Sequence, residues 1–422
     1  MRICLLNQTF FPETQATAQQ LTDLAQYLVA QGHEIWVISD RNGYEDRRKR
    51  LPAAETHEGI RIVRVASTRF GRGSFWLRAI DGLSFQFSVF LKLFALPTPD
   101  LLVSFTSPPL IGVVAGLYCR LAGVRLIQWL MDVNPAAAVA VGYLHPRARV
   151  TRLLEWAFER SLSVSRKIVV LDRWMQRRVE AMGVPPERMV VVPPWPAHDH
   201  DEDLGADPAG ARRFRARHGL EGKFVVLFSG NHSIVHPLDT VLAAALAMRG
   251  DPSVVFLFIG GGLRVEEVRA FREHHGLENI TQLPPQRREG LGESLASADL
   301  HVVVMGEAVN GLVHTSKVYG ILATGLPFVA VGPRDSHLGD LIRECPSGFR
   351  VDHGDPSGFA EIIRLARGLS AQEKLRIRDT SLAFLKNRYS RARSLETFRA
   401  AVLGESRASG TVASDVVRQA SG

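Results

Sequence analysis

The sequence predicts an α/β fold in which two doubly wound domains face each other across a central cleft. Two observations carry this prediction. Continuous runs of Val, Ile and Leu alternate with longer segments suited to helices, which is typical of parallel strands covered by helices on both faces. The alternation stops at a stretch rich in Pro, Asp, Gly and Ala near residue 200 and then restarts. Two series of similar size predict two such domains.

The first series begins at the N-terminus. Arg2–Leu6 is an apolar run that predicts a strand, and Glu34–Asp40 predicts the next one. Between them we expect a loop and then a helix over Leu21–Gln31, which Gly32 would close. Further strands are expected at residues 61–65, Asp100–Phe105, Arg125–Leu130, Lys167–Asp172 and Met189–Pro194.

The second series begins at Lys223–Asn231, a buried strand that ends in a turn. A helix over Leu238–Met248 follows, and Ser253–Gly262 repeats the unit. Further strands are expected at residues 279–284, 299–305 and 327–332. We therefore expect an N-terminal domain (1–195), a linker (196–210), a C-terminal domain (211–384), a helix that packs back on the N-terminal domain (385–405) and a disordered tail (406–422).

Composition narrows the class of protein. The chain has 422 residues, 46% apolar and 22% charged, which is ordinary globular usage and argues against a disordered or fibrous protein. Its three cysteines are odd in number and far apart, which argues against a disulfide framework and fits a reducing compartment. The net charge of +8 predicts an anionic partner: a phosphate compound, a membrane surface or nucleic acid.

The N-terminal sequence lacks the pattern of a signal peptide, because its apolar run is too short. Residues 83–96 form the most apolar long segment, but they include Lys92 and are fewer than a bilayer span needs. We therefore expect a cytoplasmic protein that can touch the inner face of a membrane without crossing it.

The loop after the strand at Lys223–Asn231 is a candidate anion site. Gly230 allows close backbone approach, and the following helix start supplies free N–H groups. His232 and His236 can donate hydrogen bonds to a phosphate. A plain turn with surface histidines remains the alternative.

A second candidate lies at the helix expected to start near Ser316. Thr315 and Ser316 are suited to cap it. Lys317 falls in its first turn, where a cation opposes the helix dipole, so Lys317 is a poor choice for stability alone. A bound pyrophosphate would reverse that argument. A solvated surface lysine is the alternative.

These features belong to a wider resemblance. The chain resembles the retaining glycosyltransferases of family four, which have the GT-B architecture of two Rossmann-like domains. The similarity covers residues 1 to about 400 and leans toward enzymes of bacterial surface polysaccharides and lipid-linked sugars. It is carried by residues 10–39, Phe105–Pro109 (FTSPP), Trp129–Pro135 (WLMDVNP), 227–245 and 316–332 (SKVYGILATGLPFVAVG).

The resemblance implies roles for particular residues. The first strand-to-helix loop approaches the donor phosphate and the acceptor, and Gln15, Ala16 and Thr17 stand where many members have Gly-Gly. Asp132 falls where relatives place an Asp or His near the reacting sugar; a helix cap is the alternative. Donor contacts are expected from Gly230, Asn231, His232, Gly261, His314, Thr315, Ser316 and Lys317.

The chain also departs from the family pattern. Two glutamates usually flank the donor with seven residues between them, and here Leu312 and Gly320 occupy those positions. An Arg and Lys pair is replaced by His232 and His236. Glu307 lies earlier in the same loop and is a second catalytic candidate besides Asp132.

The resemblance thus implies a glycosyltransferase that moves a hexosyl or acetamidohexosyl group from a nucleotide donor, UDP rather than GDP, to a lipid-linked or other glycan hydroxyl. Same-face displacement needs donors around the phosphate more than a strong base. An epimerase or hydrolase of the same fold, or an inactive partner subunit, is the alternative. No cofactor is expected. No metal is expected either, because the ligand-like run at residues 198–203 lies in the linker.

The acceptor side is indicated by residues 61–94. Residues 61–78 hold five arginines and no acid, with aromatic residues interleaved, and an apolar helix follows. This pattern predicts contact with anionic lipid. Nucleic-acid binding is not expected, because no recognised module accompanies the basic residues. A solvated basic face is the alternative.

Overall fold

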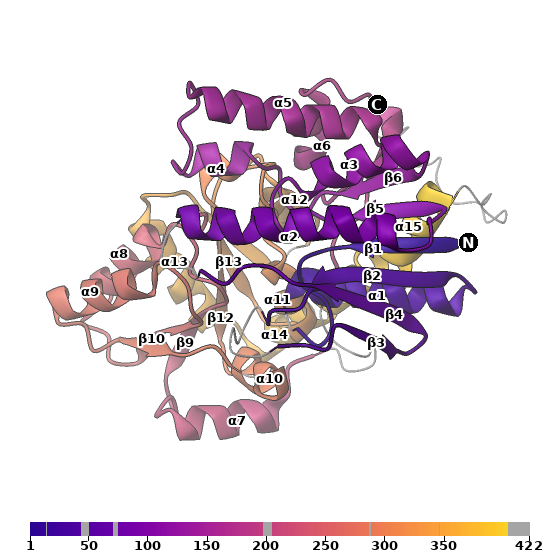
Figure 1. The fold of residues 1–422 in the computed structure, drawn as a ribbon. Helices are drawn as coiled ribbons and strands as arrows, with labels where there is room; N and C mark the ends of the chain where they lie inside the picture. Colours follow the sequence, from indigo (N-terminus) through magenta and orange to yellow (C-terminus); the bar gives the residue numbers. More distant parts are fainter. Residues whose placement is uncertain are drawn as a thin grey trace, which may run out of the picture.

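A computed structural model shows two α/β domains, one built on an eight-stranded and the other on a six-stranded sheet (Figure 1). The predicted fold class is therefore confirmed. The structure describes residues 1–13, 15–43, 50–70, 75–196, 205–286, 288–345 and 347–403. The predicted tail, most of the predicted linker and Arg72 of the predicted membrane segment lie outside these residues.

The first sheet has the strand order β3-β4-β2-β1-β5-β6-β7-β8 and is parallel except for the β3–β4 pair. Its strands are β1 (Arg2–Leu6), β2 (Glu34–Asp40), β3 (Ala54–His57), β4 (Ile60–Val65), β5 (Leu101–Ser104), β6 (Arg125–Trp129), β7 (Lys167–Val170) and β8 (Met189–Val191). Its helices are α1 (Ala16–Ala30), α2 (Phe75–Ala95), α3 (Ile111–Ala122), α4 (Ala136–Ala140), α5 (Arg149–Val164) and α6 (Arg173–Glu180), with a 3-10 turn η1 at Pro186–Arg188.

The second sheet has the order β11-β10-β9-β12-β13-β14, and its strands are parallel throughout. They are β9 (Phe224–Ser229), β10 (Val254–Ile259), β11 (Ile280–Leu283), β12 (Leu300–Val304), β13 (Phe328–Val331) and β14 (Gly348–Val351). The other elements are α7 (Pro208–Arg217), α8 (Asp239–Ala247), α9 (Val265–His275), α10 (Arg288–Ala296), η2 (Glu307–Val309), α11 (Lys317–Thr324), α12 (His337–Glu344), α13 (Pro356–Gly368), α14 (Ala371–Arg388) and α15 (Arg391–Leu403).

Some boundaries differ from those expected. Helix α1 begins at Ala16 rather than Leu21, because residues 16–20 contain no helix breaker and bury Ala18 and Gln20 against the sheet. Strand β3 was not predicted, because it is a partly exposed edge strand without an apolar run. Helix α7 begins inside the range predicted as linker, where Asp207 caps it and Pro208 takes its first position.

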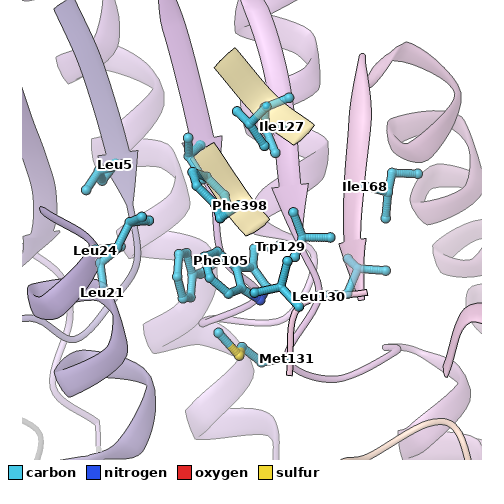
Figure 2. Packing of buried hydrophobic residues seen from close by; sticks show 14 of the residues in the cluster. Leu5, Leu21, Leu24, Phe105, Ile127, Trp129, Leu130, Met131, Ile168 and Phe398 are labelled. Atoms are coloured by element: carbon cyan, nitrogen blue, oxygen red, sulfur yellow. The ribbon is translucent and has the colours of Figure 1, made fainter. Parts of the chain in front are cut away.

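The last helix, α15, packs on the core of the first domain. Phe398 of α15 stacks on Trp129 of β6 with ring centroids 4.9 Å apart, and both side chains are fully buried (Figure 2). The Tyr27 hydroxyl of α1 donates to the Glu396 carboxylate of α15 at 2.8 Å. The chain therefore crosses from the second domain back to the first, which ties the two together.

The loops that follow β6 and β12 meet where the two domains join. Asp132, just after β6, forms an antiparallel bridge with Val313, in the loop after β12. The Val133 N–H donates to the Leu312 carbonyl at 2.8 Å. Loops from both sheets are thereby brought to one place, as expected for ligand sites of such folds. Among the described helices, none combines the length and apolarity needed to span a bilayer.

Candidate active site

Asp132 lies on the first-domain side of the cleft and keeps partial exposure to solvent. Burial raises the pKa of its carboxyl to about 6, while the charge of His314 acts in the opposite direction. The N-cap of the neighbouring helix α4 is Pro135, so the alternative role of Asp132 as a helix cap does not hold. This leaves an ionisable carboxylate facing the second domain.

Lys317 is the first residue of α11, on the second-domain side. Its Nζ is buried without a hydrogen-bond partner and lies 4.1 Å from the centroid of the Phe228 ring. Burial lowers the pKa of this ammonium to about 7. Gly230 adopts a φ of +129°, and a side chain there would lie 3.4 Å from Lys317 Nζ. The alternative of a solvated surface lysine is therefore wrong.

His232 and His236 lie close enough to Lys317 for its charge to act on both imidazoles. Both are buried rather than on the surface, so the alternative of surface histidines is also wrong. His232 Nδ1 contacts the Gly230 carbonyl at 3.1 Å, but its Nε2 has no partner, and neither has Nδ1 of His236. Burial, followed by the charge of Lys317, lowers the pKa of both imidazoles. Two neutral imidazoles and one lysine thus lie close together, each with an unpaired buried nitrogen.

The start of α11 adds further unpaired groups. Ser316 occupies the N-cap, but its side chain makes no capping hydrogen bond, contrary to expectation, and the buried Thr315 Oγ1 has no partner. The first N–H groups of α11 therefore lack a side-chain cap. Together with Lys317, His232 and His236, they form what we call the donor cradle.

The glycine-rich loop after β10 supports this cradle. Gly260 and Gly262 have φ values of +144° and +128°; a side chain at Gly260 would overlap the Gly230 carbonyl, and one at Gly262 the Asn231 side chain. Gly261, which the sequence singled out, contributes its carbonyl as acceptor for the His232 N–H at 2.8 Å. Asn231 is exposed beside it.

The two positions that carry glutamates in the family differ in their surroundings. Leu312 is buried in the core of the first domain. Gly320 has nothing within 4 Å of the place where a side chain would begin. There is therefore room for a side chain at position 320. At position 312, in contrast, the leucine side chain packs in the apolar core.

Glu307 lies elsewhere. It is exposed on η2 and lines a hollow of about 740 Å³ together with Asp239 and Thr240 of α8 and with His353. Neither Asp132 nor Lys317 lines this hollow. The carboxyl group close to the loop that leads into α11 is Asp132, whose backbone bridges that of Val313.

Residues of the first strand-to-helix loop are held by local contacts. Gln15 is the N-cap of α1 without a side-chain capping bond, and its buried Oε1 has no partner. Ala16 and Thr17 fall in the first turn of α1, not in a loop as predicted, and the Thr17 hydroxyl lies 3.5 Å from that of Thr9.

His314 sits between the two domains. Its Nδ1 lies 2.6 Å from the Asp172 carboxylate, and its Nε2 lies 3.0 Å from the Tyr319 hydroxyl. His337 stacks on the His314 ring at 4.1 Å. Asp172, His314 and His337 are close enough to hold a metal ion. Stacked rings aim their nitrogens in parallel planes rather than at one point, however, so we interpret the group as a hydrogen-bonded network.

Sequence reasoning missed Asp172, Tyr319 and His337. Asp172 ends a predicted strand, where functional residues gather, and that was the one signal available for it. Nothing local marks Tyr319 or His337, because their roles depend on His314, which reaches Asp172 across 142 positions of sequence.

Comparison with known proteins gives consistent similarities. Residues 16–195 match a family model described as a glycosyl transferase 4-like domain. WcaI of Escherichia coli (strain K12), named as a glycosyl transferase of colanic acid biosynthesis, is 26% identical over 374 residues, 82% of this chain and 87% of its own. WbjE of Pseudomonas aeruginosa, named as a glycosyltransferase, is 26% identical over 307 residues, 72% and 74% of the two chains.

Solved structures share the fold. Anabaena Alr3699/HepE in complex with UDP-glucose has a TM-score of 0.71 at 15% identity, covering 96% of this chain and 100% of its own. WaaG, a glycosyltransferase involved in lipopolysaccharide biosynthesis, has a TM-score of 0.69 at 15% identity, covering 95% and 99%.

Proposed function

The chain is a GT4-like glycosyltransferase with the GT-B fold, and from this premise we propose that it transfers a sugar from a UDP-sugar to a hydroxyl of a lipid-linked or other glycan acceptor with retention of configuration. The observation that carries the proposal is the donor cradle. Four buried polar atoms of His232, His236, Thr315 and Lys317 lack partners there. Unpaired buried groups cost free energy, so a ligand that satisfies them is expected.

The cradle suits a departing diphosphate. Lys317 supplies a point charge and Thr315 a hydroxyl donor. The unpaired nitrogens of His232 and His236 become donors when a bound diphosphate favours the protonated imidazolium. We assign Asp132, whose backbone bridges Val313 just before α11, to the sugar side of this group, where a carboxylate stabilises positive charge that develops on the sugar. The acceptor hydroxyl attacks on the face that the diphosphate leaves, and its proton passes to the departing phosphate oxygen. Positioning and charge supply the catalysis.

A binding screen tests the proposal. UDP, GDP and a panel of their sugars are compared by thermal shift, followed by calorimetry, and products are analysed with lipid-linked and soluble acceptors. We expect binding of UDP and of at least one UDP-sugar. Binding of neither nucleotide would favour the inactive partner subunit, and donor turnover without an acceptor would favour a hydrolase or epimerase.

The affinity for UDP should fall as the pH rises above about 7. Burial lowers the pKa of Lys317 to about 7 in the empty site, and a bound diphosphate favours the charged ammonium. The complex therefore binds more protons than the free protein above that pH, so rising pH opposes binding. Calorimetry in two buffers of different ionisation enthalpy should give different apparent enthalpies at pH 8. Identical enthalpies would contradict the coupling.

We further propose that the first domain rests on the inner face of an anionic membrane. Helix α3 packs between α2 and α5 on one side of the first sheet (Figure 1). Apolar side chains recur every three or four residues on the outer face of α2, so they lie in one stripe. The exposed apolar side chains are Trp76, Ile80, Leu83, Phe87, Leu91 and Phe94 on α2, Leu117 and Leu121 on α3, and Val150, Leu153 and Trp156 on α5.

Charge supports a lipid partner. Exposed basic residues border this apolar face, namely Arg78, Arg120, Arg149 and Arg152, while Asp81, the acid of α2, is buried. The predicted contribution of Arg64 is wrong, because its guanidinium is buried and pairs with Glu55 at 2.6 Å. The face thus extends beyond residues 61–94 onto α3 and α5, which composition alone did not indicate.

Replacing Leu83 and Phe87 with glutamine should weaken binding to phosphatidylglycerol-containing vesicles by about tenfold or more, because each buried apolar side chain contributes about 1.5–3 kcal/mol. Co-sedimentation measures the effect, and added salt should weaken binding of the unmodified protein by screening. Leu375→Gln, at an equally exposed leucine of α14, is the matched control and should bind normally. Equal binding of all three proteins would refute the membrane face.

A further inference from the structure

A series of hydrogen bonds joins the start of α6, in the first domain, to α11, in the second domain. We call it the hydrogen-bond chain. Asp172 precedes α6 in the first domain, and its Oδ2 accepts from His314 Nδ1 at 2.6 Å. His314 Nε2 lies 3.0 Å from the hydroxyl of Tyr319, on α11 of the second domain. The His314 side chain is 1% exposed and that of Asp172 12% exposed, so water does not replace these bonds.

The first-domain end of this chain is fixed. Asp172 Oδ1 accepts from the N–H groups of Trp174 and Met175 at 2.7 and 2.8 Å and so caps α6. Burial alone would raise the pKa of Asp172, but the hydrogen bond and charge of His314 outweigh it and hold the pKa well below its usual range. A carboxylate can only accept hydrogen bonds, so His314 Nδ1 carries a proton.

The second-domain end reaches the donor cradle. Tyr319 lies two residues after Lys317 in α11, and its ring is buried against Tyr389 with centroids 4.9 Å apart. When the His314 imidazole is neutral, the Tyr319 hydroxyl donates to Nε2. The first turn of α11 is therefore tied through His314 to the first domain.

Other groups around His314 leave it no free polar atom. His337 stacks on its ring, and burial, followed by the charge of His314, lowers the pKa of His337 to about 3. The carboxyl of Asp132 also interacts electrostatically with His314. Both nitrogens of His314 already have partners. A direct contact between His314 and pyrophosphate would therefore require breaking one of these two hydrogen bonds.

The main chain brings His314 to this position. Gly311 has a φ of +72°, and a side chain there would lie 2.7 Å from the Trp174 carbonyl. Arg178 Nε donates to the Asn310 carbonyl at 3.3 Å. These contacts dock the loop on α6, and His314 adds a hydrogen-bonded link from this loop to the Tyr319 side chain of α11.

We propose that Asp172 and His314 are positioning residues that set the start of α11, and with it Lys317, relative to the first domain. The inference rests on the proposed function, in which Lys317 holds the departing diphosphate. Small displacements of reacting groups cost large factors in rate. The hydrogen bonds from Asp172 through His314 to Tyr319 therefore make the geometry of the donor cradle depend on contact with the first domain, to which we assign the acceptor.

The first test is Asp172→Asn. The side-chain oxygen of asparagine can still cap α6, so the amide NH2 must face His314 Nδ1, which can then only accept. The proton of His314 should move to Nε2, and 15N NMR of the selectively labelled protein reports this change of tautomer. With the UDP-sugar found in the binding screen, we expect turnover to fall by about tenfold or more while UDP affinity stays within about threefold.

Tyr319→Phe breaks the other end of the chain. It should lower turnover in the same direction, and the double variant should lose less than the product of the two factors, because both changes break one network. Arg173→Ala is the matched control: it removes the neighbouring Arg173–Asp340 ion pair, with 2.6 Å between Nε and Oδ2, without touching His314. It should leave the tautomer unchanged and turnover within about threefold.

An unchanged tautomer in Asp172→Asn would overturn the inference, and so would unchanged turnover or a parallel loss of UDP affinity and turnover. The tautomer measurement needs no nucleotide. If UDP does not bind the unmodified protein, the proposed function fails, and with it the positioning role, even where the tautomer changes. If UDP binds and the tautomer does not change, only the inference fails.

Discussion

Lys317→Ala should weaken UDP binding about tenfold to 150-fold. The variant removes the buried ammonium that we assign to the diphosphate, and a charge-assisted contact of this kind contributes about 1.5–3 kcal/mol. Each ~1.4 kcal/mol changes Kd tenfold. Titration calorimetry at pH 7 measures the loss, which should also remove the buffer dependence of the binding enthalpy.

Two further variants separate charge from packing. Lys317→Met keeps an unbranched side chain over the Phe228 ring, so it should lose UDP affinity as Lys317→Ala does without loosening the core. It also removes a group that is costly to bury, so the ligand-free Tm should not fall. Lys386→Ala, at an exposed position of α14, should bind UDP normally. Unchanged affinity in the folded Lys317 variants would refute the assigned role.

Asp132→Asn should lower turnover of the UDP-sugar by about 10²–10³-fold, because it removes the one negative charge that we place against the reacting sugar while keeping the side chain's size. UDP affinity should stay within about threefold, since the unpaired atoms that we assign to the diphosphate belong to other residues. Release of UDP from the donor measures turnover, and calorimetry measures affinity.

The pH profile gives an independent reading of Asp132. Burial raises the pKa of this carboxyl to about 6, so activity should decline as the pH falls through that value and the carboxylate is neutralised. Asp132→Asn should lack this decline. Glu307→Gln is the matched comparison, because Glu307 lines a separate hollow, and we expect turnover close to normal. A larger loss in Glu307→Gln than in Asp132→Asn would move the catalytic role to Glu307.

The alternation of apolar runs and helical segments was enough to predict both sheets except for their edge strands β3 and β14. Strands such as β1, β9 and β10 are continuous apolar runs because both of their faces are covered, and that requirement is visible locally. Strand β3 escaped prediction because an edge strand needs no such run. Residues 16–20 were taken for loop because their composition suits either state and burial against the sheet decided it.

For the site, local chemistry identified some residues and not others. Lys317 stood out because a cation in a first helical turn is unfavourable without an anion, which is an argument from sequence alone. His232 and His236 were recognised as possible donors, but whether they were surface or buried depended on how Phe228 and Lys317 pack around them.

The sequence by itself thus predicted the two doubly wound domains and marked the start of α11 as a candidate anion site, since these follow from periodicity and from short-range electrostatics. Only the tertiary structure decided that His232, His236 and Lys317 are buried with unpaired polar atoms, that the apolar face continues onto α3 and α5, and that His314 joins Asp172 to Tyr319. The physical reason is the same in each case. Burial and hydrogen-bond partners are set by which loops and helices the fold brings together, and residues more than a hundred positions apart carry no local sign of meeting.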